Sequence, residues 1–572
     1  MTDAAAPFHR TSRPRMAGFL PSRIASPGDS GWTIVSALLA LILATPLIAI
    51  LWIAAAGDDG AWPHLIRTVL PTALANTVTL MVGACAGALV IGVSTAWLVT
   101  MHRFPGRAIA DRLLVLPLAM PLYVVAYAYV ELLDYAGPVQ TALRSAFGWT
   151  SVADYWFPSI RSLSGAISMF SLALYPYVYL TARASFEQQS ACVLEVARTL
   201  GRTAGQTFWE IALPLARPAL AAGAVLVAME SMNDLGAVQY LGVETLSASI
   251  YATWLQRGSL SGAAQISVVL LGLVMALLLT ERALRGRGST QATTGRYRPI
   301  PFEELSGWKG RAVLAFVLMP AAFGFFMPFA VVAVQALSHL EQGASAAFAR
   351  AAVNSLLLAS LTAIFALAVA MLLAYAMRIR RGRMTEIAGR LASFGYALPG
   401  AVLAIGLIAP LATFDNGVDA WMRSAFGIST GLLLSGSLFA VTLALVIRFL
   451  AVAIGSVEAG LQRISPSLDA AARTLGAGGL ATLFRVHLPI LAPALGAAAL
   501  LVFVDAMKEL PATLLLRPFN FDTLATHVYG LTSAEAFEEA ALGAVAIVLV
   551  GLAPVLWLHR AISDGRAGSG GG

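Results

Sequence analysis

The chain has 572 residues, of which 58% are hydrophobic and only 12% are charged, with a mean hydropathy of +0.78 and a formal net charge of +7. This composition excludes a string of soluble domains and indicates an integral membrane protein. The positive balance does not indicate nucleic-acid binding, because the Arg residues gather between apolar runs, where membrane topology requires them.

Twelve apolar runs can be marked, each of roughly 17 to 25 residues and long enough to cross a bilayer as a helix. The third and ninth runs are interrupted by Pro. The sequence therefore predicts an all-α integral membrane protein with about 12 transmembrane helices. In chain order the runs lie at 33–56, 77–100, 113–133, 164–182, 213–232, 262–280, 312–338, 355–377, 391–411, 430–452, 488–507 and 541–558.

Most of the 37 Lys and Arg residues lie in alternate connections between these runs. Because cytoplasmic loops are enriched in Lys and Arg, both termini are expected in the cytoplasm. Residues 1–32 are interpreted as a cytoplasmic tail rather than a cleaved signal peptide, and 561–572 as a flexible tail. Cys85 falls in a span and Cys192 in a cytoplasmic loop, so we expect no disulfide between them.

The chain repeats itself after 275 to 279 residues. LANTVTL at 74–80 matches AVNSLLL at 352–358, and RSAFG occurs at both 144–148 and 423–427. Each copy holds six predicted spans, so both enter the membrane in one orientation, as parallel repeats do. The predicted organisation is a first unit at 33–280, a cytoplasmic linker at 281–311 without packed structure, and a second unit at 312–560.

A half-polar segment recurs between the fourth and fifth spans of each unit. VARTLGRTAGQTFWEIALPL occupies 196–215, and AARTLGAGGLATLFRVHLPI occupies 471–490. Apolar residues at intervals of three and four, broken by a glycine, predict a short helix, a turn and a second helix that continues into the next span. Pro214 and Pro489 fall in the first turn of that span. We expect the apolar stripe to pack partly on its own unit and partly on a partner, although an ordinary amphipathic surface hairpin would show a similar pattern.

This pattern resembles the cytoplasmic EAA loop of ABC importer permeases, the family that works with a periplasmic binding protein. The resemblance rests on E-V-A-R-T-L-G, then nine residues, then I-A-L-P. In the second copy Ala470 occupies the Glu position, and the acid lies one residue earlier. The candidate coupling residues are Glu195, Ala197, Arg198, Gly201, Ile211, Leu213 and Pro214 in the first copy, and Asp469, Ala472, Arg473, Gly476, Val486, Leu488 and Pro489 in the second.

The resemblance implies a type I ABC importer permease fold in a bacterial inner membrane. It also implies three kinds of partner, namely two copies of an ABC ATPase subunit, a periplasmic substrate-binding protein and membrane lipid, with no nucleic acid. The only lysines, Lys309 and Lys508, do not lie in G-x-x-x-x-G-K-[ST]. We therefore expect no enzyme activity, no catalytic residue and no cofactor on this chain, and ATP on the partner subunit.

Two further stretches, LALYPYVYLTARASFEQQS at 172–190 and MESMNDLGAVQYLGV at 229–243, resemble fused two-unit permeases of ferric iron importers. The implied substrate is iron(III). Related fused permeases carry thiamine or other small solutes, so such a solute is the alternative. An ion-coupled secondary transporter is a second alternative, since parallel six-helix repeats also occur there. A membrane enzyme is the third class, but no nucleophile paired with a base supports it.

Carboxylates end the fifth span of each unit, and acids near membrane depth are candidates for a substrate path. Glu230 and Asp234 correspond to Asp505 and Glu509 at an offset of 275. We expect these four to gather near the outer mouth, where oxygen ligands would attract a hard trivalent ion. The competing interpretation is a set of solvated helix-end charges, one of them neutralised by Lys508, and it is favoured because acidic helix ends outside the membrane are common.

No metal site is predicted. Tyr175, Tyr177 and Tyr179 carry oxygen that could ligate iron(III), but alternate residues of a helix do not share a face, so membrane-interface or packing roles fit better. His487 is expected to be a surface residue rather than a ligand.

Overall fold

The computed structural model describes residues 29–57, 59–189, 201–285, 303–379 and 382–564. Within these residues, eleven helices are long and apolar enough to cross a membrane, and twelve segments qualify when one sharply bent pair counts as a single span. The predicted all-α membrane protein with about twelve spans is confirmed. The number of spans agrees with the number of apolar runs in the sequence. An apolar run in the bilayer must form a helix, because only a helix satisfies its backbone polar groups within the segment.

The first unit contains long helices linked by shorter ones. The long helices are α1 (Asp29–Ala56), α2 (Trp62–Met101), α6 (Leu163–Gln188), α9 (Leu213–Asn233) and α12 (Leu260–Arg285). The shorter elements are β1 (His102–Arg103), α3 (Arg107–Leu113), η1 (Leu116–Ala119), α4 (Leu122–Leu133), α5 (Pro138–Phe147), η2 (Val152–Asp154), α8 (Ala204–Thr207), η3 (Phe208–Ala212), α10 (Gly236–Tyr240) and α11 (Leu246–Leu255).

The second unit repeats this order. Its long helices are α13 (Gly307–Ala321), which continues through η4 (Ala322–Phe326) into α14 (Met327–Ser338), then α16 (Ala346–Ile379), α18 (Gly400–Phe426), α19 (Leu438–Gln462), α22 (Leu488–Met507) and α25 (Phe537–Asp564). The shorter elements are β2 (Glu303–Glu304), α15 (Leu340–Gly343), α17 (Arg383–Phe394), η5 (Gly395–Ala397), α20 (Pro466–Thr474), α21 (Gly479–Thr482), η6 (Leu483–His487), α23 (Pro511–Leu516) and α24 (Leu524–Ser533).

The two units make the same internal contacts. The Asn76 amide donates a hydrogen bond to the carbonyl of Glu244 at 3.0 Å, and the Asn354 amide donates to the carbonyl of Asp522 at 2.9 Å. The matched asparagines of the repeated motif therefore have one structural role, which is to hold the loop that precedes the matching short helix. The repeat seen in the sequence is a repeat of structure.

The predicted third span at 113–133 is not a straight helix. Arg107–Ala119 and Leu122–Phe147 form a pair bent by 97°. Pro121 lies at the break, where its missing N–H and fixed φ prevent a continuous helix. A window of hydropathy cannot detect this bend, because both arms of the pair are apolar.

The ninth predicted span is also displaced. Its expected limits were 391–411, whereas α18 begins at Gly400, directly after Pro399, and continues to Phe426. Proline again sets the boundary. The early part of the expected run belongs to α17 and η5, which end before the span begins.

The units are packed into each other. Helix α1 packs on α17 and α18 of the second unit, and α14 packs on α4 of the first unit and on α25. The Tyr129 hydroxyl donates to the carbonyl of Phe323 at 2.9 Å across this boundary. One cluster of buried apolar side chains extends through both units. The interface between them is therefore part of the core.

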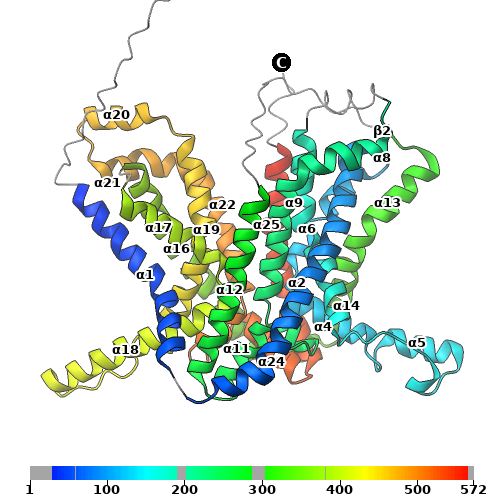
Figure 1. The fold of residues 1–572 in the computed structure, drawn as a ribbon, viewed down its shortest axis with the longest axis horizontal. Helices are drawn as coiled ribbons and strands as arrows, with labels where there is room; N and C mark the ends of the chain where they lie inside the picture. Colours follow the sequence, from blue (N-terminus) through cyan, green and yellow to red (C-terminus); the bar gives the residue numbers. More distant parts are fainter. Residues whose placement is uncertain (1–28, 58, 190–200, 286–302, 380–381, 565–572) are drawn as a thin grey trace, which may run out of the picture.

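Elements from both units lie at the same ends of the molecule. Figure 1 shows α8 and α20 at one end, and α11 and α24 toward the other. Much of the predicted linker lies outside the described residues, but its last part is packed. Strand β2 pairs in parallel with β1, which the Gly, Ser and Pro content did not predict.

Candidate functional site

The second copy of the repeated polar segment has the predicted form. Helix α20 ends at a turn where Gly476 has φ of +78°, and α21 follows. The N–H of Ala477 donates to the carbonyl of Ala472 at 2.9 Å, which closes the end of the helix. The left-handed conformation explains the glycine, since a side chain there would be strained. Arg473 also lies in α20.

Only the later part of the first copy can be compared. Glu195, Ala197 and Arg198 lie outside the described residues. Gly201 has φ of +79°, nearly the value of its counterpart, and α8 follows it as α21 follows Gly476. The two loops therefore share their turn.

A π turn joins each loop to the following span. Pro214 and Pro489 each lie two residues beyond the π turn. Because proline lacks an N–H and its ring crowds the carbonyl four residues earlier, the helix widens before it. The predicted residues are arranged alike in both copies, with Ile211 and Val486 in the π turns, and Leu213, Pro214, Leu488 and Pro489 in the first turns of α9 and α22.

The apolar stripe of the second loop is divided between the interior and the surface. Ala472 and Leu483 are buried, whereas Leu475 is 87% exposed. This confirms that the stripe packs in part on its own unit. The exposed part offers apolar surface that another molecule could cover.

Two exposed aromatic side chains were missed in the sequence. Trp209 is 67% exposed and Phe484, its counterpart at an offset of 275, is 61% exposed. Trp209 directly follows Phe208, and Phe484 directly follows Leu483, and these preceding residues are the stripe residues that pack inward. A comparison of the two copies could have found them, because large apolar side chains occupy the same position next to the stripe in both.

Asp469 is bound within the chain. Its carboxylate lies 2.9 Å from Nη2 of Arg378 and 2.6 Å from Nε2 of His487. His487 is only 1% exposed, so the expectation of a surface histidine is wrong. The histidine is the last residue of η6, and its side chain contacts Asp469 of α20. A pattern of α-helical spacing could not show this, because a π turn changes the spacing of its own side chains.

A cavity of about 110 Å³ lies between the two units, and its wall includes all four predicted carboxylates, Glu230, Asp234, Asp505 and Glu509. Tyr177 and Arg448 also line it, and they lie near the middle of α6 and α19. The carboxylates therefore gather as expected, but midway along these helices rather than at an outer mouth. Helices α9 and α22 end inside the protein, which hydropathy could not reveal.

The interpretation of these acids as solvated helix-end charges is wrong for Glu509, whereas its expectation that Lys508 neutralises one of them is confirmed by the contact of Lys508 with Asp505. Glu509 is 5% exposed and accepts hydrogen bonds from the N–H groups of Ala512 and Thr513 at 2.8 and 3.0 Å. Asp234 accepts in the same way from Ala237 at 2.8 Å. These two acids cap the short helices α23 and α10. Their burial is compatible with charge because backbone donors face them.

The other two acids face the cavity with different partners. Asp505 lies 2.9 Å from Nζ of Lys508, and Glu230 accepts a hydrogen bond from the Tyr396 hydroxyl at 3.3 Å. Arg448 lies 3.5 Å from Glu509. Among the described residues, neither Glu230 nor Asp234 forms a salt bridge. Four carboxylates against two cations leave the ionisable side chains of the wall with an excess of negative charge.

Both cations come from the second unit. At an offset of 275, Lys508 corresponds to Asn233 and Arg448 corresponds to Ala173. The Asn233 side-chain oxygen accepts from Arg448 at 3.2 Å, so the two units meet at this point. The sequence indicates that Lys508 lies next to the acids. For Arg448 it indicates only a position within or beside a span, and it does not reveal that this residue lines the cavity.

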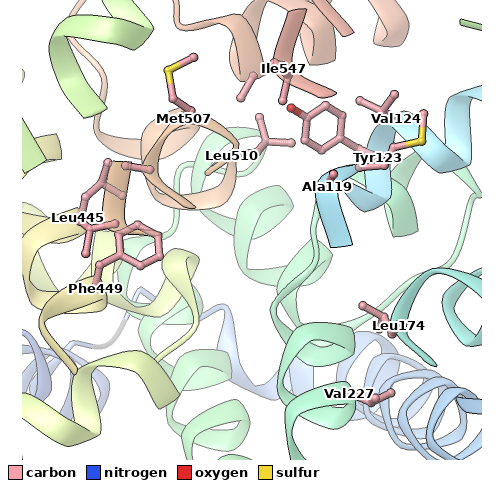
Figure 2. Close-up of a cluster of buried hydrophobic side chains, with 14 of the residues drawn as sticks. Ala119, Tyr123, Val124, Leu174, Val227, Leu445, Phe449, Met507, Leu510 and Ile547 are labelled. Atoms are coloured by element: carbon pink, nitrogen blue, oxygen red, sulfur yellow. The ribbon is translucent and has the colours of Figure 1, made fainter. Parts of the chain in front are cut away.

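Apolar and aromatic side chains from both units complete the wall. Figure 2 shows Tyr123 and Leu174 of the first unit and Phe449 and Leu510 of the second around this region, and all four line the cavity. Of the three tyrosines considered in α6, only Tyr177 belongs to this wall. Tyr175 and Tyr179 are fully buried elsewhere, which confirms that the three do not form one site.

The cavity is not built as a coordination centre. Within the described part of the chain, no group of three or more His, Cys, Asp or Glu residues could hold a metal ion. The wall offers carboxylate oxygen atoms from both units. Such a lining can attract a cation and still release it.

The comparisons with known proteins agree with this architecture. The family described as "Binding-protein-dependent transport system inner membrane component" matches residues 88–281 and again 366–567. The chain belongs to this family. Because the match occurs twice, this permease consists of two fused family units, and each match covers the repeated polar loop and the carboxylates of its unit.

The names of the relatives of this permease mention several different substrates. It is 26% identical over 92% of its length to the Fe(3+)-transport system permease protein FbpB 2 of Haemophilus influenzae, covering 97% of that protein. It is 30% identical to the Molybdenum transport system permease protein ModB of Escherichia coli over 34% of its length and 84% of the relative. It is 29% identical to the Sulfate transport system permease protein CysT of Salmonella typhimurium over 35% of its length and 70% of the relative.

Proposed function

We propose that this permease carries iron(III) across the inner membrane, receives it from a periplasmic binding protein, and is driven by two copies of an ATPase subunit that dock on the two repeated loops. The ATP is bound by those subunits, and both termini of the permease are cytoplasmic. A relative that matches 92% of the chain is named as an Fe(3+)-transport system permease, which supports this substrate.

The negative excess of the central cavity is the main observation in support. Hard trivalent cations prefer oxygen ligands, and Glu230 and Asp505 supply carboxylate oxygen at the wall. Molybdate and sulfate are anions, and an excess of carboxylates would repel them. The ModB and CysT relatives each match only about one unit, so their names bear less on the whole cavity.

Helices α9 and α22 connect the loops to the cavity. Each begins at a π turn that carries an exposed aromatic residue, Trp209 or Phe484, and each carries a cavity carboxylate in its last turn. An α-helix of this length is a stiff rod of roughly 30 Å. A push by the ATPase on either loop would therefore move Glu230 or Asp505, which provides a route from ATP hydrolysis to alternating access.

Lys508 acts as a resident cation in this scheme. Its ammonium group lies 2.9 Å from Asp505 and occupies the position that an arriving cation would seek. The entering ion competes with Lys508 for the carboxylate, and Lys508 returns when the ion leaves. This competition keeps binding weak enough for passage.

The deciding experiment is uptake of radiolabelled iron(III) by cells with and without this chain, followed by the double variant Glu230→Gln and Asp505→Asn. We expect uptake to need the chain and ATP, and to fall at least tenfold in the double variant. Glu244→Gln, an exposed acid outside the cavity wall, is the matched control and should retain uptake.

Competing solutes separate this proposal from its alternatives. Chain-dependent uptake of labelled molybdate or sulfate, with no uptake of iron(III), would replace iron(III) by an oxyanion. Chain-dependent uptake of labelled thiamine, again without iron(III), would favour that organic cation. Uptake that persists after ATP depletion would point to an ion-coupled secondary transporter.

A further inference from the structure

Two arms project from the transmembrane body on opposite sides. The first arm comprises residues 135–159 and includes α5, and the second comprises residues 413–433 and includes the last part of α18. Figure 1 shows α5 extending to one side and α18 to the other, at the end of the molecule away from α8 and α20. Neither arm contributes to the cavity or to the coupling loops.

The repeated RSAFG motif ends the helix of each arm. Gly148 and Gly427 have φ of +71° and +69°, so both helices stop at the same left-handed turn. Phe147 and Phe426 precede them and are 63% and 62% exposed. The repeat therefore preserves a largely exposed aromatic side chain, whose ring packs on Trp149 in the first arm and on Trp421 in the second.

Hydrogen bonds hold the first arm in shape. The Gln140 amide donates to the carbonyl of Leu133 at 2.8 Å, and the Tyr155 hydroxyl donates to the Gln140 side-chain oxygen at 2.6 Å. Trp149 stacks on Tyr155 with ring centroids 4.8 Å apart. The arm is therefore braced against the end of α4 rather than attached by its ends alone.

Carboxylates brace the second arm. Asp415 is fully buried and accepts hydrogen bonds from the N–H groups of Leu434 and Ser435 at 3.0 and 2.7 Å. Asp419 accepts from the N–H of Thr430 at 2.8 Å. Different bonds thus keep both arms folded while their apolar side chains stay outside.

The exposed surface of the arms is apolar and aromatic. In the first arm Trp156 is 86% exposed, and in the second Trp421 is 60% exposed. Burial of such side chains is worth about 25 cal/mol per Å² of apolar area, so exposure to water would be costly. Tryptophan is the residue most typical of the boundary between lipid and water.

The second arm is continuous with the lipid-facing surface. Phe414 and Trp421 lie seven residues apart on α18 and share one face of this helix. The first residue of α18, Gly400, donates its N–H to the side-chain oxygen of Asn233 in the cavity wall. No break separates the span from the arm. Since lipid surrounds the spans, an arm that extends sideways from them lies over lipid rather than over the centre of the molecule.

We propose that both arms lie in the bilayer interface at this end of the protein, with Phe147, Trp156, Trp421 and Phe426 among the lipid headgroups and the first part of the acyl chains. They anchor the two units at opposite edges, as amphipathic interfacial helices do. A soluble partner would instead be expected over the cavity between the units, and the arms point away from it.

The test uses the full chain in bilayer nanodiscs of phosphatidylethanolamine and phosphatidylglycerol, with Cys85 and Cys192 replaced by Ala. Single cysteines at Phe147 and Phe426 carry nitroxide labels. The matched controls are Ser145→Cys and Ser424→Cys, which lie in the same motif, are exposed and face another side of the helix. Collision of each label with oxygen reports lipid, and collision with a water-soluble nickel chelate reports water.

We expect a several-fold higher ratio of oxygen to nickel collisions at Phe147 and Phe426 than at the two serine positions. Equal nickel access at all four positions would overturn the proposal. Nickel access that falls only when a soluble binding protein is added would overturn it as well, since it would assign the arms to a protein partner. The serine labels show in each case that the arm is folded and accessible.

Discussion

His487 Nε2 lies 2.6 Å from Oδ1 of Asp469, which ties the start of α22 to the first helix of the second repeated loop. Arg378 of α16 holds the same carboxylate at 2.9 Å. The acid that replaces the expected glutamate therefore stabilises its own loop. This gives a structural reason to expect the two loops to differ.

Asp469→Ala should destabilise the second loop. The substitution removes hydrogen bonds to charged groups worth about 1.5–3 kcal/mol each and leaves buried His487 without this acceptor. We expect a lower midpoint of thermal unfolding in detergent and weaker stimulation of the ATPase. Glu195→Ala is the comparison in the first copy, and the prediction of unequal loops fails if both variants change the two measurements alike.

At Gly201 and Gly476, a substituted residue should be limited by its backbone conformation and not by the size of its side chain. A Cβ at either position would have no atom within 4 Å, so the constraint is the positive φ alone. Valine at such a backbone conformation costs about 1–3 kcal/mol, whereas asparagine adopts it more readily. We expect Gly476→Val to abolish uptake with the protein still in the membrane, and Gly476→Asn to retain most of it. Equal uptake by the two variants would show that the turn does not matter.

Trp209 and Phe484 should anchor the ATPase subunits. Exposed aromatic side chains in a docking surface often contribute about 2 kcal/mol, which is roughly 30-fold in affinity. Trp209→Ala with Phe484→Ala is expected to weaken the purified complex by at least that factor, measured by titration with the ATPase. Trp308→Ala, an exposed tryptophan outside both loops, should leave the affinity unchanged. Full affinity of the double variant would exclude these side chains as anchors.

Lys508 should set how easily the substrate leaves. Lys508→Asn copies the residue of the first unit and removes the cation paired with Asp505. We expect tighter binding and slower turnover, seen as a lower half-saturating iron concentration together with a lower maximal uptake rate in proteoliposomes. Lys508→Arg keeps the charge and should restore both values toward those of the parent. A variant that raises the half-saturating concentration instead would refute the resident-cation role.

The errors made from sequence have a common cause. The bend at Pro121, the burial of His487 and the position of the carboxylates midway along α6 and α19 all depend on what packs beside a segment. A hydropathy window measures composition along the chain. It cannot tell an acid at a solvated helix end from an acid that caps a short helix in the core.

The sequence by itself determined the membrane class, the number of spans, the two-unit repeat and the turns at Gly201 and Gly476, because these follow from local composition, spacing and backbone conformation. Only the tertiary structure decided that the cavity shared by Glu230 and Asp505 lies beside the middle of α6 and α19, that both of its cations come from the second unit, and that Asp469 is held inside its loop. Those relationships join residues that are far apart in the chain, and they exist only after the two units have packed into each other.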